Sequence, residues 1–229
     1  MAFKPVTHVL FDMDGLLLNT EDLYTVVYEK VLAPYNKKYP WEYKVTLMGL
    51  QAREAAESVI AHYKLPITAD EWIAETKKLF EIIFLDSQLM PGAKRLIEHL
   101  HKHDIPIALA TSSTKESYEL KTNKHHTELF SLFNIKTFGS SDPEVKRGKP
   151  QPDIFLITAD RFPDKPNPEK CLVFEDAVNG VKAAHAAGMQ VVMVPDARLD
   201  RSLAPEATLI LNSLEEFDPK LFGLPPFEL

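Results

Sequence analysis

The sequence predicts an α/β fold, a doubly wound parallel sheet with a helical unit inserted into it. Six short and almost uninterrupted apolar runs alternate with helical patterns along most of the 229 residues, as expected for parallel strands covered on both faces. From about residue 18 to residue 89 the alternation stops and only helical patterns occur. We therefore expect an α/β core over residues 1–17 and 90–229, and a separate helical domain over residues 18–89.

The strands of the core are expected at the apolar runs, which cover 6–11, 105–111, 135–139, 171–174, 190–194 and 208–211. Helical patterns lie between these runs, at 91–103, 114–132, 152–161 and 177–187. The first helix opens beside Pro91, where a missing backbone N–H costs least. The last ends at Gly188, a residue that tolerates the left-handed backbone of a helix C-terminus. Strand and helix thus alternate as a parallel sheet requires.

The inserted unit and the end of the sequence depart from this alternation. Helices are expected in the insert at 21–34, 52–63 and 69–85, with prolines between them. The segment 219–229 contains two adjacent prolines, and we expect it to be an irregular strap on the surface.

Composition restricts the class of function. The formal charge is −7, from 26 Lys and Arg against 33 Asp and Glu, so the basic face of a nucleic-acid binder is not expected. A single cysteine, Cys171, excludes an intramolecular disulfide and a multi-cysteine zinc site, and its apolar neighbours predict a buried thiol. Apolar stretches are shorter than the ~18 residues of a membrane span. We expect a cytoplasmic monomer with no nucleic-acid or membrane partner.

Polar side chains that suit phosphate chemistry follow four of the expected strands. Ligands of a parallel sheet bind at the carboxyl ends of its strands, where these side chains would meet. Each group alone has an ordinary explanation, because Asp favours turns and Ser and Thr cap helices. Together they offer oxygen ligands for Mg²⁺, donors for phosphoryl oxygens and a cation, as phosphoryl transfer requires. In chain order they are Asp12 and Asp14, Thr111 to Ser113, Lys149, and Glu175 with Asp176.

These groups, in this order and spacing, resemble the four motifs of the haloacid dehalogenase-like hydrolase superfamily. The motifs are Asp-Met-Asp-Gly at 12–15, Thr-Ser-Ser at 111–113, Gly-Lys-Pro-Gln-Pro-Asp-Ile-Phe at 148–155 and Phe-Glu-Asp-Ala-Val-Asn-Gly at 174–180. The helical insert resembles the α-helical cap of phosphatase and mutase members. Further runs, such as Lys-Lys-Tyr at 37–39 and Leu-Phe-Gly-Leu-Pro at 221–225, are similar to the pseudouridine-5′-phosphatases of the superfamily.

The resemblance implies a Mg²⁺-dependent phosphomonoester hydrolase that forms an aspartyl-phosphate. Asp12 would be the nucleophile, and Asp14 would be the general acid and then the general base. The metal would be held by the carboxylates of Asp12 and Asp176 and by the main-chain carbonyl of Asp14. Glu175 would support the water shell of the metal.

The resemblance also assigns the phosphate-binding groups and a substrate. Thr111 and Ser112 would hold the phosphoryl oxygens, and Lys149 would offset the charge of the nucleophile and the phosphate. The substrate would be a small phosphorylated metabolite, with pseudouridine 5′-phosphate preferred. In the insert, Glu21, Gly49 and Arg53 are candidate substrate contacts. Glu21 is equally well explained as an ordinary acidic residue of a first helical turn. Arg53 is equally well explained as a surface residue of its helix.

Two departures from the family pattern leave alternatives open. Asn19 stands where many members have Asp, and Tyr24 stands where the β-phosphoglucomutase branch has His. A sugar phosphomutase of that type therefore remains an alternative, as does a phosphatase of another small sugar phosphate. A binding module without catalysis is the third reading, and it is weakly supported because every motif acid is present.

Overall fold

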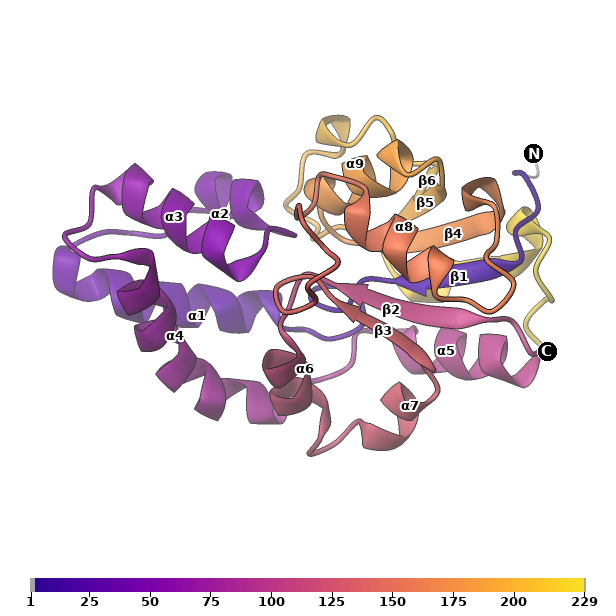
Figure 1. Ribbon diagram of the computed structural model, residues 1–229, viewed down its shortest axis with the longest axis horizontal. Coiled ribbons are helices and arrows are strands. Elements are labelled where there is room, and N and C mark those ends of the chain that lie inside the picture. The colour runs from indigo at the N-terminus through magenta and orange to yellow at the C-terminus, as the bar shows by residue number, and fades with distance from the viewer. Residues whose placement is uncertain (1–2, 229) are drawn as a thin grey trace.

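A six-stranded parallel sheet, in the order β3-β2-β1-β4-β5-β6, forms the centre of the computed structural model, which describes residues 3–228 (Figure 1). The order reverses at β1, which pairs in parallel with β2 on one side and with β4 on the other, so the predicted doubly wound α/β fold is confirmed. All six expected strands are present, at His8–Phe11, Ile107–Thr111, Ile135–Phe138, Cys171–Glu175, Gln190–Met193 and Leu209–Ile210.

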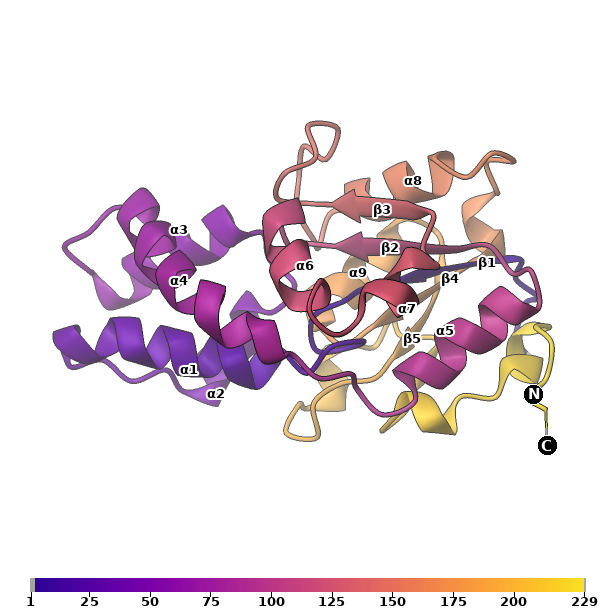
Figure 2. The same cartoon turned by 90° about the horizontal axis from the view of Figure 1, so that it is seen from below.

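Helices cover both faces of the sheet, as the uninterrupted apolar runs predict. On one face lie α5 (Ala93–Lys102) and α7 (Thr127–Ser131), which Figure 2 shows on the near side of the strands. The other face is covered by α8 (Asp153–Asp160) and α9 (Val178–Ala186). Because both faces are buried, neither face of a central strand such as β1 carries a row of polar residues.

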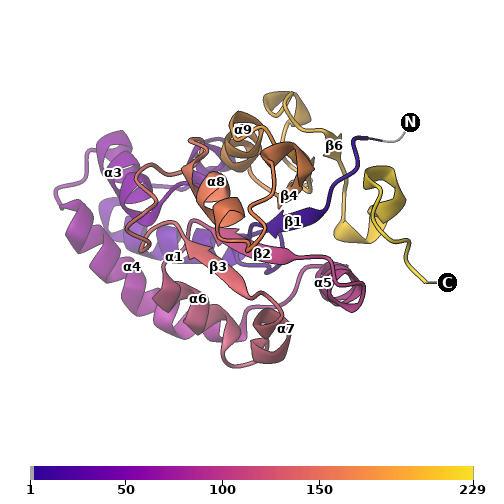
Figure 3. The ribbon, with the colours of Figure 1, turned by 45° about the vertical axis from the view of Figure 1, so that its right-hand side comes forward.

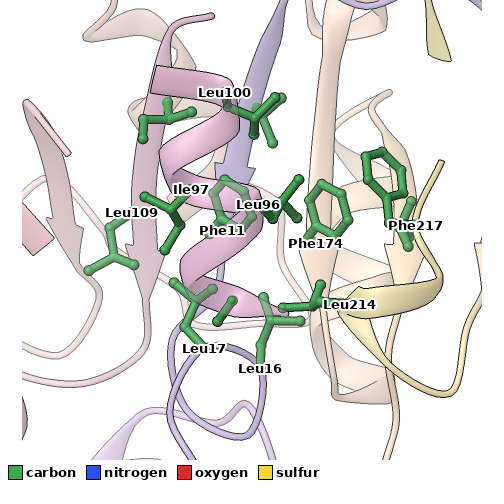
Figure 4. Packing of buried hydrophobic residues seen from close by; sticks show 14 of the residues in the cluster. Phe11, Leu16, Leu17, Leu96, Ile97, Leu100, Leu109, Phe174, Leu214 and Phe217 are labelled. Carbon is green, nitrogen blue, oxygen red and sulfur yellow. The ribbon is translucent and has the colours of Figure 1, made fainter. Parts of the chain in front are cut away.

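Alternate residues of β1 belong to different cores. Phe11 points to the α5 side, where its ring stacks on Phe174 of β4 with centroids 5.0 Å apart, and Figure 4 shows Leu96 and Ile97 beside this pair. Leu10 points to the opposite side and packs among residues of α8 and α9. Burial of each such side chain stabilises the fold by about 1.5–3 kcal/mol, so this strand is firmly held just before its polar end.

Four helices after β1 form a group of their own, on the left of Figure 1, and have a separate hydrophobic core. They are α1 (Glu21–Leu32), α2 (Trp41–Leu47), α3 (Ala52–Tyr63) and α4 (Ala69–Ile83). In their core the rings of Tyr28 and Trp72 meet edge to face at 5.2 Å. Helix α2 was not expected from the sequence, because seven residues are too few to show a helical period. The domain boundaries at residues 18 and 89 stay a prediction.

Two expectations about the core helices and the last segment were wrong. The pattern at 114–132 is not one helix but α6 (Lys115–Thr122) and α7, because a polar run at 123–126 interrupts its apolar face. Figure 3 shows α6 beside the end of α4. The segment after 219 is more than a surface strap: Pro219–Phe222 form a 3₁₀ helix, and Phe222 is fully buried. Leu229 lies outside the described residues.

Across residues 3–228, every helix is too short or too polar to cross a membrane. Cys171 at the start of β4 is buried, as predicted.

Candidate active site

The carboxylate of Asp12 lies against a buried lysine. Asp12 follows β1, and its backbone N–H bonds to the carbonyl of Phe174, which brings it beside Glu175 at the end of β4. The ammonium of Lys149, whose side chain is fully buried, donates to Asp12 Oδ1 and to Glu175 Oε1, both at 2.6 Å. Burial would lower the pKa of Lys149, but the two carboxylates outweigh burial and raise it. The lysine is therefore a fixed positive charge behind Asp12.

A third carboxylate, that of Asp176, completes a buried acidic cluster. Oxygens of Asp12, Glu175 and Asp176 all lie within 4.8 Å of one another. Burial raises the pKa of Asp176 well above its ordinary value, and the charges of its two acidic neighbours raise it further. Burial also raises the pKa of Asp12, to about 7, although Lys149 opposes the shift. Carboxylates crowded in this way favour a bound cation.

Two motif glycines allow this crowding. Gly15 has a φ of +81°, and a Cβ atom there would lie 2.2 Å from Oδ2 of Asp176. A Cβ atom on Gly180, in the first turn of α9, would lie 1.9 Å from the carboxyl carbon of Glu175. Side chains at these positions would displace the two acids, so the glycines of the first and fourth motifs serve the geometry of the cluster.

Asp14 faces away from the cluster and has a lysine of its own. Its Oδ1 accepts hydrogen bonds from Lys121 Nζ and Thr20 Oγ1, both at 2.6 Å, and its Oδ2 accepts from Ser113 Oγ at 2.8 Å. Burial would raise the pKa of Asp14, but Lys121 and these hydrogen bonds lower it. Lys121 was not expected at the site from the sequence, because half of the residues of α6 are charged and the helix resembles a solvent-exposed one.

The hydroxyl residues at the end of β2 line the cavity of the site. Thr111 ends the strand, and its Oγ1 accepts from the N–H of Ser113 at 3.1 Å. Ser112 lines the same cavity, but its Oγ donates to the carbonyl of Gly49 at 2.8 Å, so this side chain joins the sheet to the helical unit. The hydroxyl of Thr111 and the N–H groups of this turn are the donors expected for phosphoryl oxygens.

A cavity of about 230 Å³ opens between the strand ends and the four helices. Its floor includes Asp12, Asp14 and Asp176, and the turn 111–114 forms one wall. The opposite wall is mostly apolar and rich in aromatic rings, supplied by Tyr24, Tyr28, Tyr39, Trp72 and Phe80. The cavity thus has a charged end and an aromatic end.

Of the three candidate contacts in the insert, two line this cavity and one does not. Glu21 borders it, with its carboxylate 3.2 Å from Lys44, and Gly49 borders it from the loop before α3. Arg53 lies outside: its exposed guanidinium pairs with Asp70 across the helical unit. Arg53 is therefore a surface residue of α3, which was the alternative to a substrate contact.

The two departures from the family pattern also have a physical explanation. Asn19 is exposed, and its neighbour Thr20 is the residue that contacts Asp14. Tyr24 lines the cavity, and its hydroxyl accepts a hydrogen bond from Lys121 at 3.0 Å. The change at position 19 therefore removes no charge from the cluster.

The family model for haloacid dehalogenase-like hydrolases matches residues 6–188, which span all four motifs. The chain belongs to this family. A "Probable pseudouridine-5'-phosphatase" from Drosophila melanogaster is 54% identical over 99% of this chain and 97% of the relative. A "(DL)-glycerol-3-phosphatase 2" from Arabidopsis thaliana is 50% identical over 97% and 93%. This haloacid dehalogenase-like protein is a phosphatase, a phosphoric monoester hydrolase whose substrate is a small phosphorylated metabolite.

Solved structures agree with the fold of this haloacid dehalogenase-like phosphatase. A β-phosphoglucomutase from Clostridium difficile superposes with a TM-score of 0.76, at 20% identity, and the match covers 93% of each chain. At that identity the likeness concerns the fold alone.

The residues of this haloacid dehalogenase-like site fit a divalent cation. Two lysines, Lys121 and Lys149, pair with members of the four-acid group, which leaves a surplus of two negative charges when all four acids are ionised. Asp176 carries the least compensated of these charges. Oxygen ligands of this kind, without His or Cys, suit Mg²⁺. The four acids are Asp12, Asp14, Glu175 and Asp176.

Proposed function

We propose that this phosphatase is Mg²⁺-dependent, works through an aspartyl-phosphate on Asp12, and acts on pseudouridine 5′-phosphate. The observation that carries the chemistry is the division of the acid pair after β1. Asp12 joins the acidic cluster and Lys149, whereas Asp14 faces Lys121, Thr20 and Ser113. Two adjacent carboxylates with different surroundings suit the two roles of nucleophile and acid–base.

Asp12 performs the covalent step. A carboxylate oxygen of Asp12 attacks phosphorus, and the bond from phosphorus to the leaving oxygen breaks. Lys149 keeps the Asp12 carboxylate in place and offsets charge as the phosphoryl group arrives. Thr111 Oγ1 and the N–H groups of the turn after it bind the phosphoryl oxygens.

Asp14 moves the proton in both halves of the reaction. In the first half its carboxyl group donates a proton to the leaving oxygen, and the nearby phosphate charge favours the protonated form needed there. In the second half the Asp14 carboxylate takes a proton from the water that attacks the aspartyl-phosphate. Phosphate then leaves, and the Asp12 carboxylate is regenerated.

The proposed metal ligands are the carboxylates of Asp12 and Asp176 and the main-chain carbonyl of Asp14. Glu175 would support the water shell of the metal. Bound there, Mg²⁺ would supply charge neutralisation at the phosphoryl oxygens. The two motif glycines described above leave the space that the side chains of Asp176 and Glu175 occupy.

The aromatic end of the cavity supports a substrate with a ring. Tyr24, Tyr28 and Trp72 offer flat apolar surfaces on which a pyrimidine can lie, and Glu21 and Thr76 add hydrogen-bonding groups. Glycerol 3-phosphate, which the name of the Arabidopsis relative suggests, is the second candidate; it would leave most of this surface unused. The alternative of a sugar phosphomutase has no such support, because the likeness to a β-phosphoglucomutase concerns the fold alone and the similar relatives are named as phosphatases.

One phosphate-release panel with Mg²⁺ tests the substrate. Pseudouridine 5′-phosphate should have a kcat/KM at least about tenfold above hexose 6-phosphates, the worth of roughly one matched buried hydrogen bond. A glycerol or hexose phosphate that ranks first would overturn the substrate assignment. Isomerised sugar phosphate without free phosphate would identify a mutase.

A matched pair of variants locates the specificity. Glu21→Gln changes a cavity wall, and Arg53→Ala changes the exposed helix surface beside it. The preference for pseudouridine 5′-phosphate should shrink in Glu21→Gln and stay unchanged in Arg53→Ala. The reverse pattern would contradict the proposed orientation of the substrate. A monomeric state and a cytoplasmic location stay predictions.

A further inference from the structure

A second buried lysine in the site, Lys121, lies outside the four motifs. It comes from α6, and its side chain has no exposed surface. Its ammonium donates to Asp14 Oδ1 at 2.6 Å and to Ser113 Oγ at 3.0 Å. Ser113 in turn donates to the other oxygen of Asp14, at 2.8 Å. Lys121 and Ser113 therefore hold both oxygens of the carboxylate from one side.

The same ammonium also touches the inserted helices. Its third hydrogen bond goes to the hydroxyl of Tyr24 in α1, at 3.0 Å. It lies 4.4 Å from the ring centroid of Phe84, in the 3₁₀ turn that ends α4. These contacts come from both ends of the insert, so Lys121 connects the orientation of Asp14 with the helices that cover the cavity.

We propose that Lys121 is a positioning residue that holds the Asp14 carboxylate in its working orientation and couples that orientation to the inserted helices. The inference rests on the proposed acid–base role of Asp14. A buried lysine that served charge balance alone would need one contact with a carboxylate. Lys121 makes three hydrogen bonds, to Asp14 after β1, to Ser113 after β2 and to Tyr24 in α1. Because these partners lie in three different segments, they fix the position of the ammonium nitrogen.

The test compares two phosphate esters in Lys121→Met. An alkyl ester, pseudouridine 5′-phosphate, needs a proton on its leaving oxygen, whereas p-nitrophenyl phosphate needs little proton assistance. The parameter kcat/KM reports the step that releases the leaving group. It should fall about 100-fold for the alkyl ester, as a misplaced catalytic group would cause. The loss for the aryl ester should be at least about tenfold smaller. Equal losses would overturn the proposal.

A second comparison asks whether Lys121 acts through Asp14. When Asp14 is already replaced in Asp14→Asn, adding Lys121→Met should change kcat/KM for the alkyl ester no further. Losses that multiply would show an independent role and overturn the proposal. Lys124→Met, at an exposed lysine that pairs with Asp86, is the matched control and should keep wild-type values.

Two measurements cover failure of folding or of the proposed substrate. If Lys121→Met does not fold, Lys121→Arg keeps the charge but changes its shape: a loss confined to the alkyl ester supports the proposal, and equal losses or none overturn it. If pseudouridine 5′-phosphate is not hydrolysed, the substrate assignment fails, and sn-glycerol 3-phosphate serves as the alkyl ester. A crystal structure of the variant should also show the Asp14 carboxylate turned away from Ser113; an unchanged carboxylate would overturn the proposal.

Discussion

At the scale of single residues, the two acids after β1 differ because each pairs with a different lysine. Asp12 and Asp14 are two positions apart in the chain, yet Lys149 pairs with the first and Lys121 with the second. The pKa of Asp12 is raised to about 7 by burial, whereas that of Asp14 is lowered because Lys121 and its hydrogen bonds outweigh burial. Residues two positions apart in an extended strand point to the same side, so it is the turn after β1, with the positive φ of Gly15, that gives the two carboxylates different surroundings.

Asp12→Asn should abolish the covalent step and leave the fold intact. The amide cannot form an acyl-phosphate, so kcat should fall by more than about 100-fold. The melting temperature should stay close to the wild-type value, because one charge leaves a crowded cluster and Lys149 keeps Glu175 as its partner. Steady-state phosphate release and thermal melting measure the two effects. Asp22→Asn, at an exposed acid of α1, is the control.

At the scale of elements, the loop between α2 and α3 closes the cavity. Its Met48 carbonyl accepts from the side chain of Asn179, its Gly49 carbonyl accepts from Ser112, and Gln51 donates to the carbonyl of Gly139 at 2.6 Å. Ser112 and Gly139 lie in the turns that follow β2 and β3, and Asn179 lies in the first turn of α9, after β4. The loop therefore fastens the helical unit over the strand ends, and we expect this contact to limit the access of bulk water to the cavity.

Gln51→Ala should weaken this closure without touching the catalytic groups. Loss of one hydrogen bond of about 0.5–1.5 kcal/mol should raise KM by about two- to tenfold, with a smaller change in kcat. Gln88→Ala is the matched control, because that exposed side chain bonds only within its own turn, to the carbonyl of Asp86. A larger effect of Gln88→Ala on KM than of Gln51→Ala would refute this assignment of the loop.

For the whole molecule, the site concentrates buried negative charge that a bound cation would neutralise. Asp12 and Asp176 of the acidic cluster lie at the cavity between the strand ends and the inserted helices, so we expect charge repulsion there to oppose folding. Folding and metal binding should therefore be linked.

Mg²⁺ should stabilise the folded protein as well as activate it. At a Mg²⁺ concentration of about 100 times the Kd, binding contributes about 2.7 kcal/mol, which raises the melting temperature by roughly 5–10 °C for a chain of this size. Activity should disappear with a chelator and return with Mg²⁺, and Ca²⁺ should substitute poorly because it prefers more ligands at longer distances. Turnover that resists the chelator would contradict the metal assignment.

Without metal, the free energy of unfolding should fall as pH rises from about 4 to about 7. The pKa of Asp12 rises from 3.8 to about 7 on folding, and that of Asp176 also rises, so the folded state binds more protons in this range. Urea melts at pH 5 and pH 7.5 measure the decline. The decline should be absent with saturating Mg²⁺, because the ion neutralises the same carboxylates. A metal-free protein that is equally stable at both values would show that the cluster is not strained.

The sequence was sufficient for the doubly wound sheet and for the four strand-end motifs. Short apolar runs that alternate with helical patterns are typical of parallel strands buried on both faces, and the carboxyl ends of parallel strands meet at one edge of the sheet. Asp12 and Asp176 were therefore predictable as neighbours before any coordinates, and the family resemblance implied that Lys149, in the long loop after β3, lies beside them.

Tertiary structure alone decided which of the remaining charged residues reach the site. Lys121 and Arg53 both lie in helices with many charged residues, and helix spacing does not show which face of a short helix is covered. Packing of α6 against the end of α4 buries Lys121 beside Asp14, whereas α3 turns Arg53 toward Asp70 and solvent. A charged side chain can be buried only where partners from distant parts of the chain pair with it, and the local sequence does not identify those partners.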